Sequence, residues 1–199
     1  MEAITHPDIR ILSIATRPDC LSEKILDLLE NLNRIKPVWV ELGLQTIHEE
    51  SARYIRRGYE LPVFENAVSE LRKRGIDVIV HTILCLPNET EQDILQTIEY
   101  LNHQDIQGIK LQLLHVLKDT DLGDIYLASP FYIPTPEEYY QLLGMCISHL
   151  RPDIVIHRLT GDGPKNLLIA PLWTCNKRQV LNQFQSYLKT HDIWQGKEC

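Results

Sequence analysis

Polar side chains interrupt three apolar runs in the middle of the chain, at 38–45, 77–86 and 108–116. Buried parallel strands usually read as nearly continuous apolar runs, so polar residues inside them need an explanation. Carboxylate, imidazole, ammonium and amide groups can transfer protons or hold a polar ligand. In chain order the interrupting residues are Glu41, Gln45, His81, Lys110, Gln112 and His115.

The faces that these residues occupy follow from strand geometry. Because side chains alternate along a strand, Glu41 and Gln45 share one face of the first run. Lys110 and Gln112 share one face of the third run, and His115 lies on its opposite face. In barrel-like α/β folds the carboxyl ends of the strands carry the active site, so these groups predict a polar ligand pocket there. Each residue alone is equally explained as a hydrogen-bonded polar group of the core.

The apolar runs alternate with amphipathic helices, which predicts an α/β fold with a parallel sheet and right-handed crossovers. The first helix is expected to turn Ile25, Leu28, Leu29 and Leu32 towards the core. Strands are expected at 9–16, 38–45, 77–86, 108–116 and 154–159, and helices are expected to begin at or near Ser22, His48, Pro62, Thr90, Asp121, Thr135 and Asn176.

The composition is that of a globular protein, and its length predicts one domain over residues 1–199. The formal net charge of −7 argues against broad electrostatic binding to nucleic acid, which needs an excess of lysine and arginine. No apolar run approaches the roughly 18 residues of a membrane span, and the first residues carry no signal-peptide pattern. These features predict a soluble, cytoplasmic protein with no membrane partner.

The five cysteines are spread along the chain without CxxC or CxxxCxxC spacing, so no metal site is expected in this chain. Cys85 is expected to pack in the core rather than act as a nucleophile. The loop Thr160-Gly161-Asp162-Gly163 could cradle an anion with backbone N–H groups, although such a loop is more typical of a simple turn. Leu172, Trp173 and Phe184 are expected to be packing groups.

Six short motifs, taken in order, resemble one protein family. In this order and spacing they resemble the YhcC-like branch of the radical S-adenosylmethionine (SAM) superfamily, often labelled uncharacterised Fe–S oxidoreductases. The resemblance runs from about Ile9 to about Leu188, and the ordered set is more specific than any single motif. The motifs are Ala15-Thr16-Arg17-Pro18-Asp19, Glu41-Leu42-Gly43-Leu44-Gln45-Thr46, Arg56-Arg57-Gly58, His81-Thr82-Ile83-Leu84-Cys85-Leu86-Pro87-Asn88-Glu89-Thr90, Lys110-Leu111-Gln112-Leu113-Leu114-His115 and Ala170-Pro171-Leu172-Trp173.

The resemblance implies a partial parallel (β/α) barrel, with 9–116 as the core and 117–199 as a C-terminal extension that completes it. In this family three cysteines hold a [4Fe–4S] cluster, and SAM occupies the remaining position on its unique iron. One electron then cleaves SAM to methionine and a 5′-deoxyadenosyl radical, which abstracts a hydrogen from the substrate. The cofactors supply the radical chemistry, and the protein orients and shields them.

The resemblance also implies roles for individual residues. Gln45 matches a position that touches the SAM ribose, and Arg57 matches an arginine that pairs with the SAM carboxylate, for which a guanidinium fork is suited. His81 stands where relatives place a polar residue facing the ribose or adenine, and Ile83 lies on the strand that flanks adenine. Cys85 replaces a common glycine, which would crowd that contact. The candidates for the substrate side, and hence for catalysis, are Arg17, Gln112 and His115.

One departure from the family is large: the cluster cysteines and the methionine-binding strand should precede Ile9 by many residues. The chain begins about where the third barrel strand would start, so we expect a barrel truncated at its N-terminus. Its first strand would then be an exposed parallel edge. An exposed edge predicts a homodimer, an aggregation-prone chain, or association with a separate N-terminal segment.

Three functions remain open from the sequence. The first is the C-terminal part of a radical SAM enzyme acting on an unknown substrate, with tRNA as one candidate. The second is a non-catalytic remnant that keeps part of the SAM pocket or binds a partner. The third is an unrelated barrel hydrolase or lyase that uses Glu41, His81 and His115 in acid–base roles.

Overall fold

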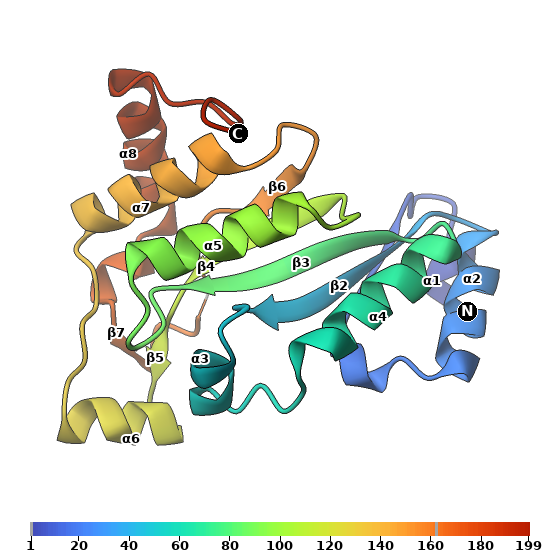
Figure 1. The fold of residues 1–199 in the computed structure, drawn as a ribbon, viewed down its shortest axis with the longest axis horizontal. Coiled ribbons are helices and arrows are strands. Elements are labelled where there is room, and N and C mark those ends of the chain that lie inside the picture. The colour runs from blue at the N-terminus through green and yellow to red at the C-terminus, as the bar shows by residue number, and fades with distance from the viewer. Residues whose placement is uncertain (1, 162) are drawn as a thin grey trace.

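The computed structural model of the chain describes residues 2–161 and 163–199, and a parallel sheet forms its centre (Figure 1). The five strands run in the order β1-β2-β3-β4-β6, and each neighbouring pair is parallel. The predicted α/β class and parallel part-barrel architecture are therefore confirmed. The strand bounds are β1 (Leu12–Thr16), β2 (Val38–Gln45), β3 (Asp77–Leu84), β4 (Gly108–Leu113) and β6 (Val155–Arg158).

A small antiparallel pair stands apart from this sheet. β5 (Val116–Leu117) pairs with β7 (Leu168–Ala170), so the run expected as one strand at 108–116 is broken after Leu113. The sequence did not reveal β7, because three residues are too short for a periodic signal. The helices are α1 (Glu2–Thr5), α2 (Glu23–Asn33), α3 (Glu49–Tyr54), α4 (Leu61–Lys73), α5 (Glu91–Asn102), α6 (Asp121–Ala128), α7 (Pro136–His149) and α8 (Lys177–Thr190).

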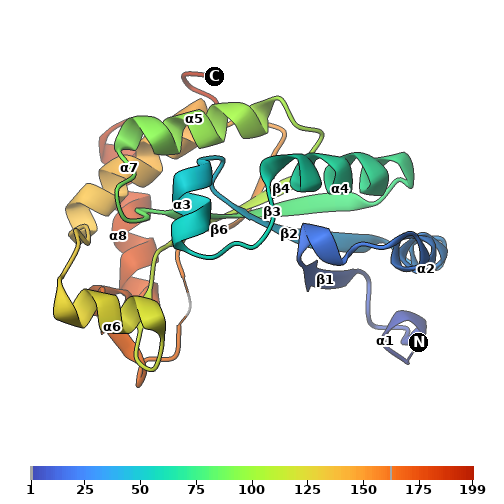
Figure 2. The same ribbon diagram turned by 60° about the horizontal axis from the view of Figure 1, so that its bottom comes forward.

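Helices α4 and α5 cover one face of the sheet. Figure 2 shows α4 and α5 above the strands, whereas no helix of the described chain lies across the middle of the lower face. On the helix-covered face, apolar side chains such as Val40, Val80 and Leu111 are completely buried. The lower face carries the alternate side chains of each strand, and we call it the open face.

Two predictions about packing are wrong. In α2 the buried residues are Leu26 and Leu29, whereas Ile25 and Leu28 are 41% and 54% exposed. The reason is that α2 packs against β2 beside the edge strand, where a narrower stripe of the helix finds a neighbour. Leu172, expected to pack, is exposed.

The other packing expectations hold. Phe184 is buried, and Trp173 lies against Tyr139 with ring centroids 5.7 Å apart. The predicted loop at 160–163 falls partly outside the described residues, because it includes Asp162. None of the helices in the described ranges is long and apolar enough to cross a membrane.

Helix capping gives a first test of the local structure. Thr90 and Thr135 each close a capping box at the start of α5 and α7, whereas the side chain of Ser22 makes no cap hydrogen bond at α2. We therefore expect Thr90→Ala to lower the free energy of unfolding by about 1 kcal/mol. Ser22→Ala is the matched control and should change little. Urea denaturation measures both, and equal losses would contradict the assigned caps.

Candidate functional site

A hydrogen-bonded network of polar side chains crosses the open face, and Glu41 on β2 is its centre. Ser13 Oγ, on β1, donates to Glu41 Oε1 over 2.7 Å. His81 Nε2, on β3, lies 2.8 Å from Glu41 Oε2, which also accepts a hydrogen bond from the Lys110 ammonium on β4. One carboxylate thus joins four neighbouring strands.

The network continues to β6 through Gln112. Arg158 donates to Gln112 Oε1 over 3.2 Å, and Gln112 Nε2 lies 3.3 Å from His81 Nδ1. Because a guanidinium can only donate, the Gln112 carbonyl must face Arg158 and its amide N–H must face His81. His81 Nδ1 is then an acceptor, and Nε2 carries the proton that is donated to Glu41. The network therefore fixes one neutral tautomer of His81.

The charges of the network follow from its geometry. Burial raises the pKa of Glu41, but hydrogen bonds from Lys110, Ser13 and His81 outweigh it and bring the pKa to about 2. Burial lowers the pKa of His81 more than the hydrogen bond to Glu41 raises it. At neutral pH the network thus holds a carboxylate, a neutral imidazole and a cationic Lys110. Such an array orients polar ligand groups and can exchange protons at His81.

The network lies nearer the middle of the strands than the sequence predicted. Glu41 and His81 are central in β2 and β3. Gln45 and Arg158 end β2 and β6, and Ile83 and Gln112 lie next to the ends of β3 and β4. The predicted sharing of faces is confirmed in β2 and β4, where half-buried side chains alternate with buried ones; the half-buried set includes Glu41, Gln45, Lys110 and Gln112. His115 lies beyond the end of β4, so its predicted face stays a prediction. The pocket expected there is instead an open sheet face.

Two adjacent strands end in strained backbone. Gln45, the last residue of β2, and Cys85, just after β3, have φ values of 68° and 63°. Such left-handed conformations favour glycine and cost a residue with a side chain about 1 kcal/mol. At Cys85 the same conformation would suit the glycine that the resemblance implies at this position. Strain of this kind concentrates at functional sites, which supports a ligand site at this end of the sheet.

Gly43 makes room for the Gln45 side chain. A Cβ atom at residue 43 would come within 2.6 Å of Gln45 Nε2 and 3.6 Å of the Tyr59 hydroxyl. The Tyr59 hydroxyl donates to the Gly43 carbonyl. The Gln45 amide is therefore held over the backbone of its own strand, on the open face.

Arg57 is placed differently from the role that the resemblance implies. Its side chain is 1% exposed, and its guanidinium makes four hydrogen bonds inside the protein. The acceptors are the carbonyls of Tyr59, Leu44 and Thr46 and the carboxylate of Glu49. In this arrangement Arg57 ties the end of β2 to α3 and has little donor capacity left for a ligand carboxylate.

The remaining candidates are dispersed. Arg17 pairs with Asp19 and lies over the Tyr59 ring at 5.6 Å, so it borders the carboxyl end of β1. His115 packs against Gly161, where a Cβ atom would come within 2.6 Å of its ring. Gln112 is the one substrate-side candidate that contacts His81. The hydrolase alternative loses support, because the contacts described for His115 are with Gly161 and Gly163, whereas Glu41 and His81 are hydrogen-bonded to each other.

Cys85 behaves as the predicted packing group. It is buried, and burial raises the pKa of its thiol to about 12. Cys20 and Cys199 are exposed. We expect iodoacetamide at pH 8 to alkylate those two cysteines at least about tenfold faster than Cys85 in the folded protein, because the thiolate is the nucleophile. Mass spectrometry of peptides measures this, and early labelling of Cys85 would contradict its burial.

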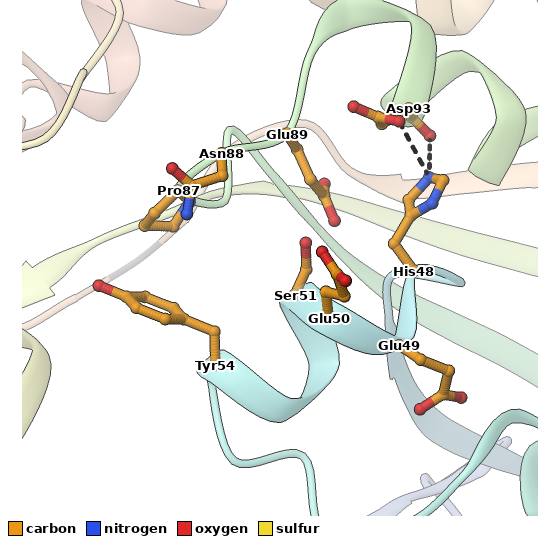
Figure 3. Close-up of a pocket in the computed structure, with 9 residues that line it drawn as sticks. All are labelled: His48, Glu49, Glu50, Ser51, Tyr54, Pro87, Asn88, Glu89 and Asp93. Atoms are coloured by element: carbon orange, nitrogen blue, oxygen red, sulfur yellow. Dashed lines mark hydrogen bonds and ion pairs between the residues drawn. The ribbon is translucent and has the colours of Figure 1, made fainter.

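Two cavities flank the turn that follows β3, away from the network. The first, of about 370 Å³, lies between α3 and this turn, with Glu50, Ser51 and Glu89 converging on it (Figure 3). Burial raises the pKa of Glu89, whose carboxylate accepts a 2.6 Å hydrogen bond from Thr46. The second, of about 640 Å³, extends from the same turn to Tyr132. Their acidic lining would suit a cation, but no residue of the polar network reaches them.

The described residues do not fit an iron–sulfur cluster. No three His, Cys, Asp or Glu side chains among residues 2–161 and 163–199 are placed to hold a metal ion. Cys85 and Cys146 are buried as thiols, and the other cysteines lie apart in sequence. The open face instead offers the hydrogen-bonding groups of the network and an apolar side chain, Ile83.

Sequence reasoning missed two members of the network. Ser13 lies in a run expected as a strand, and its small hydroxyl gave no signal. Arg158 stands inside the apolar run 154–159, so the same rule that singled out Glu41 applied to it as well. The signal for Arg158 is therefore a charged residue within an apolar run that is expected to form a strand.

Comparisons with known proteins support the same family throughout the chain. Residues 2–101 match the model of the Radical SAM superfamily, and residues 106–190 match the model of the Radical_SAM C-terminal domain. The uncharacterized protein YtqA of Bacillus subtilis is 40% identical over 190 residues, which cover 96% of this chain and 59% of YtqA. Protein YhcC of Escherichia coli K12 is 33% identical over 193 residues, covering 96% of this chain and 62% of YhcC.

The chain thus spans less than two thirds of the length of these relatives. Among solved structures, the archaeal Methanocaldococcus infernus Elp3 with an N-terminal deletion is similar, with a TM-score of 0.79 and 19% identity. The match covers 93% of this chain and 43% of that chain. This likeness shows a shared fold.

Proposed function

Because the chain belongs to the YhcC-like branch of the radical SAM superfamily, we propose that it forms the part of a radical SAM enzyme that faces SAM and substrate. The observation that carries the proposal is the polar network that crosses all five strands on the uncovered face of the parallel sheet. A buried face of a parallel sheet would be apolar throughout. A face that is both polar and uncovered fits a ligand surface.

SAM fits this face at the ends of β2 and β3. Gln45 would offer its amide to the ribose hydroxyls, His81 would orient polar groups of the nucleoside, and Ile83 would pack against adenine. Arg57 is left out of this set, because its guanidinium is committed to backbone carbonyls and Glu49. SAM bound there would supply the radical chemistry of the superfamily. The residues of this chain would orient SAM and substrate.

The described residues do not fit the cluster of the superfamily, so this proposal assigns none of them to it. A non-catalytic SAM-binding remnant is the second candidate function, and the same observation favours it. Neither of these two candidate functions specifies the substrate. tRNA is one candidate, for which the net charge of −7 provides no general electrostatic attraction.

The test is anaerobic incubation of the purified chain with iron, sulfide, SAM and a strong reductant. We expect SAM to be retained in equilibrium dialysis, no four-iron cluster to form, and no 5′-deoxyadenosine to appear. A cluster and 5′-deoxyadenosine would show that the scattered cysteines can replace the missing motif, contrary to this proposal. Failure to retain SAM would contradict the assignment of the open face.

The edge of the sheet supports a proposal about partners. β1 pairs with β2 alone among the described strands, and the neighbouring side chains of Ile11 and Ile25 are 37% and 41% exposed. An unpaired parallel edge beside apolar surface is a template for another strand. We expect the chain to form a dimer in light scattering at high concentration. A monodisperse monomer would count against this expectation.

A further inference from the structure

Arg158 differs from the other arginines because it is partly buried and forms no ion pair with a described residue. Arg10, Arg53 and Arg178 also lack an ion pair among the described residues, but these three are exposed, whereas Arg158 is partly buried. The arginines that do form ion pairs with carboxylates are Arg17, Arg34, Arg56, Arg57, Arg72, Arg74 and Arg151. Among the described residues, Arg158 is therefore the partly buried guanidinium that no carboxylate compensates.

The surroundings of Arg158 leave its charge unbalanced. The nearest basic group in register is Lys110, whose ammonium is already bound to Glu41. His81 is neutral in this network, so one carboxylate faces two cations. A net positive charge therefore remains on the β6 side of the open face, in a chain whose formal net charge is −7.

The donor capacity of Arg158 is also largely unused within the protein. Its one hydrogen bond to a described residue is the 3.2 Å bond to the Gln112 carbonyl, whereas a guanidinium has five N–H donors. A partly buried charge without a counter-ion is unfavourable, and an anion would relieve that cost. The planar fork of arginine suits two oxygens of a carboxylate or phosphate at once.

We propose that Arg158 binds an anionic group of the substrate, a carboxylate or a phosphate, on the β6 side of the open face. Gln112 holds the guanidinium in place and connects it to His81. The bound anion would then lie across β3 and β4 from Gln45, which marks the SAM side. The assignment of the anion to the substrate rests on the proposed function, whereas anion binding at Arg158 does not.

The test follows the Nε–Hε resonance of Arg158 and the backbone amide resonances of β6 by NMR while the chain is titrated with inorganic phosphate or with acetate. The backbone amides report binding in the variants that lack the Arg158 side chain. We expect at least one of the two to give a saturable shift, and the anion that binds more tightly identifies the chemical class. Arg158→Gln should weaken the binding about tenfold or more, and Arg158→Lys less, because lysine keeps the charge without the fork. Arg178→Gln, at an exposed unpaired arginine on α8, is the matched control and should bind as the wild type does.

Two results would overturn the proposal. If neither anion gives a saturable shift, or if Arg158→Gln binds as tightly as Arg178→Gln, Arg158 holds no anion. If SAM itself shifts the Arg158 resonance and Arg158→Gln weakens SAM binding, the anion is the SAM carboxylate and the substrate assignment is wrong. Equal melting temperatures of Arg158→Gln and the wild type show that a loss of binding is not a loss of fold. Because no step of this test requires SAM cleavage, its outcome is separate from that of the proposed function.

Discussion

We expect the Arg57→Met variant to lose about 3 kcal/mol or more of unfolding free energy. The substitution removes the donor that satisfies the carbonyls of Leu44, Thr46 and Tyr59, and it leaves Glu49 without its cation. Buried acceptors without donors are costly, because they lose water and gain nothing in return. Urea denaturation at neutral pH measures the loss.

The neighbouring residue supplies the control for this prediction. Arg56 is 77% exposed and pairs with Asp121 at the surface, so Arg56→Met should change the free energy of unfolding by less than about 1 kcal/mol. SAM binding by Arg57→Met tests the alternative role of Arg57. If Arg57→Met unfolds like the wild type but no longer binds SAM, Arg57 is the carboxylate-binding residue that the family resemblance implies.

The second large effect is expected at Glu41. Glu41→Gln removes the charge that compensates Lys110, and both side chains are mostly buried, at 16% and 13% exposed. Breaking a fully buried ion pair costs about 3–5 kcal/mol, and solvent contact reduces this to about 2–3 kcal/mol here. The double variant Glu41→Gln, Lys110→Met should recover most of the loss, because no cation is then left without a partner. If the double variant is no more stable than Glu41→Gln, the loss of stability does not come from an uncompensated Lys110.

The same carboxylate makes a pH prediction. The pKa of Glu41 is about 2 in the folded chain, below its value of about 4.3 in the unfolded chain. A lowered carboxylate pKa stabilises the fold fully above the unfolded value, and the contribution is lost as pH falls towards the folded value. The difference between wild type and Glu41→Gln should therefore be largest above about pH 5 and shrink towards pH 2. A difference independent of pH would contradict this assignment.

The sheet was predictable because its signals are local. The run 38–45 has the bounds of β2, and the alternation of side chains placed Lys110 and Gln112 on one face of their strand, as observed. The sequence could not predict which of the polar side chains contact one another across neighbouring strands. Two neighbouring strands in register bring His81 to Glu41, and register depends on contacts between segments distant in sequence.

Arg57 shows the limit of motif transfer. The motif places an arginine beside the end of β2, and both the sequence and the structure agree on that position. Its partners depend on how the chain turns between β2 and α3, where carbonyls of Leu44 and Thr46 point inward. A turn of this kind has no periodic pattern, so the sequence could not distinguish a ligand-binding arginine from one that supports the backbone.

The most direct test of the central claim is to map SAM binding on the chain by NMR. The account predicts that SAM shifts the backbone resonances of Gln45, His81 and Ile83 in a saturable manner. It also predicts that resonances of the acidic cavity, such as those of Glu50 and Ser51, stay in place. Shifts confined to that cavity, or no saturable shift at all, would contradict the assignment of the open face as the SAM site.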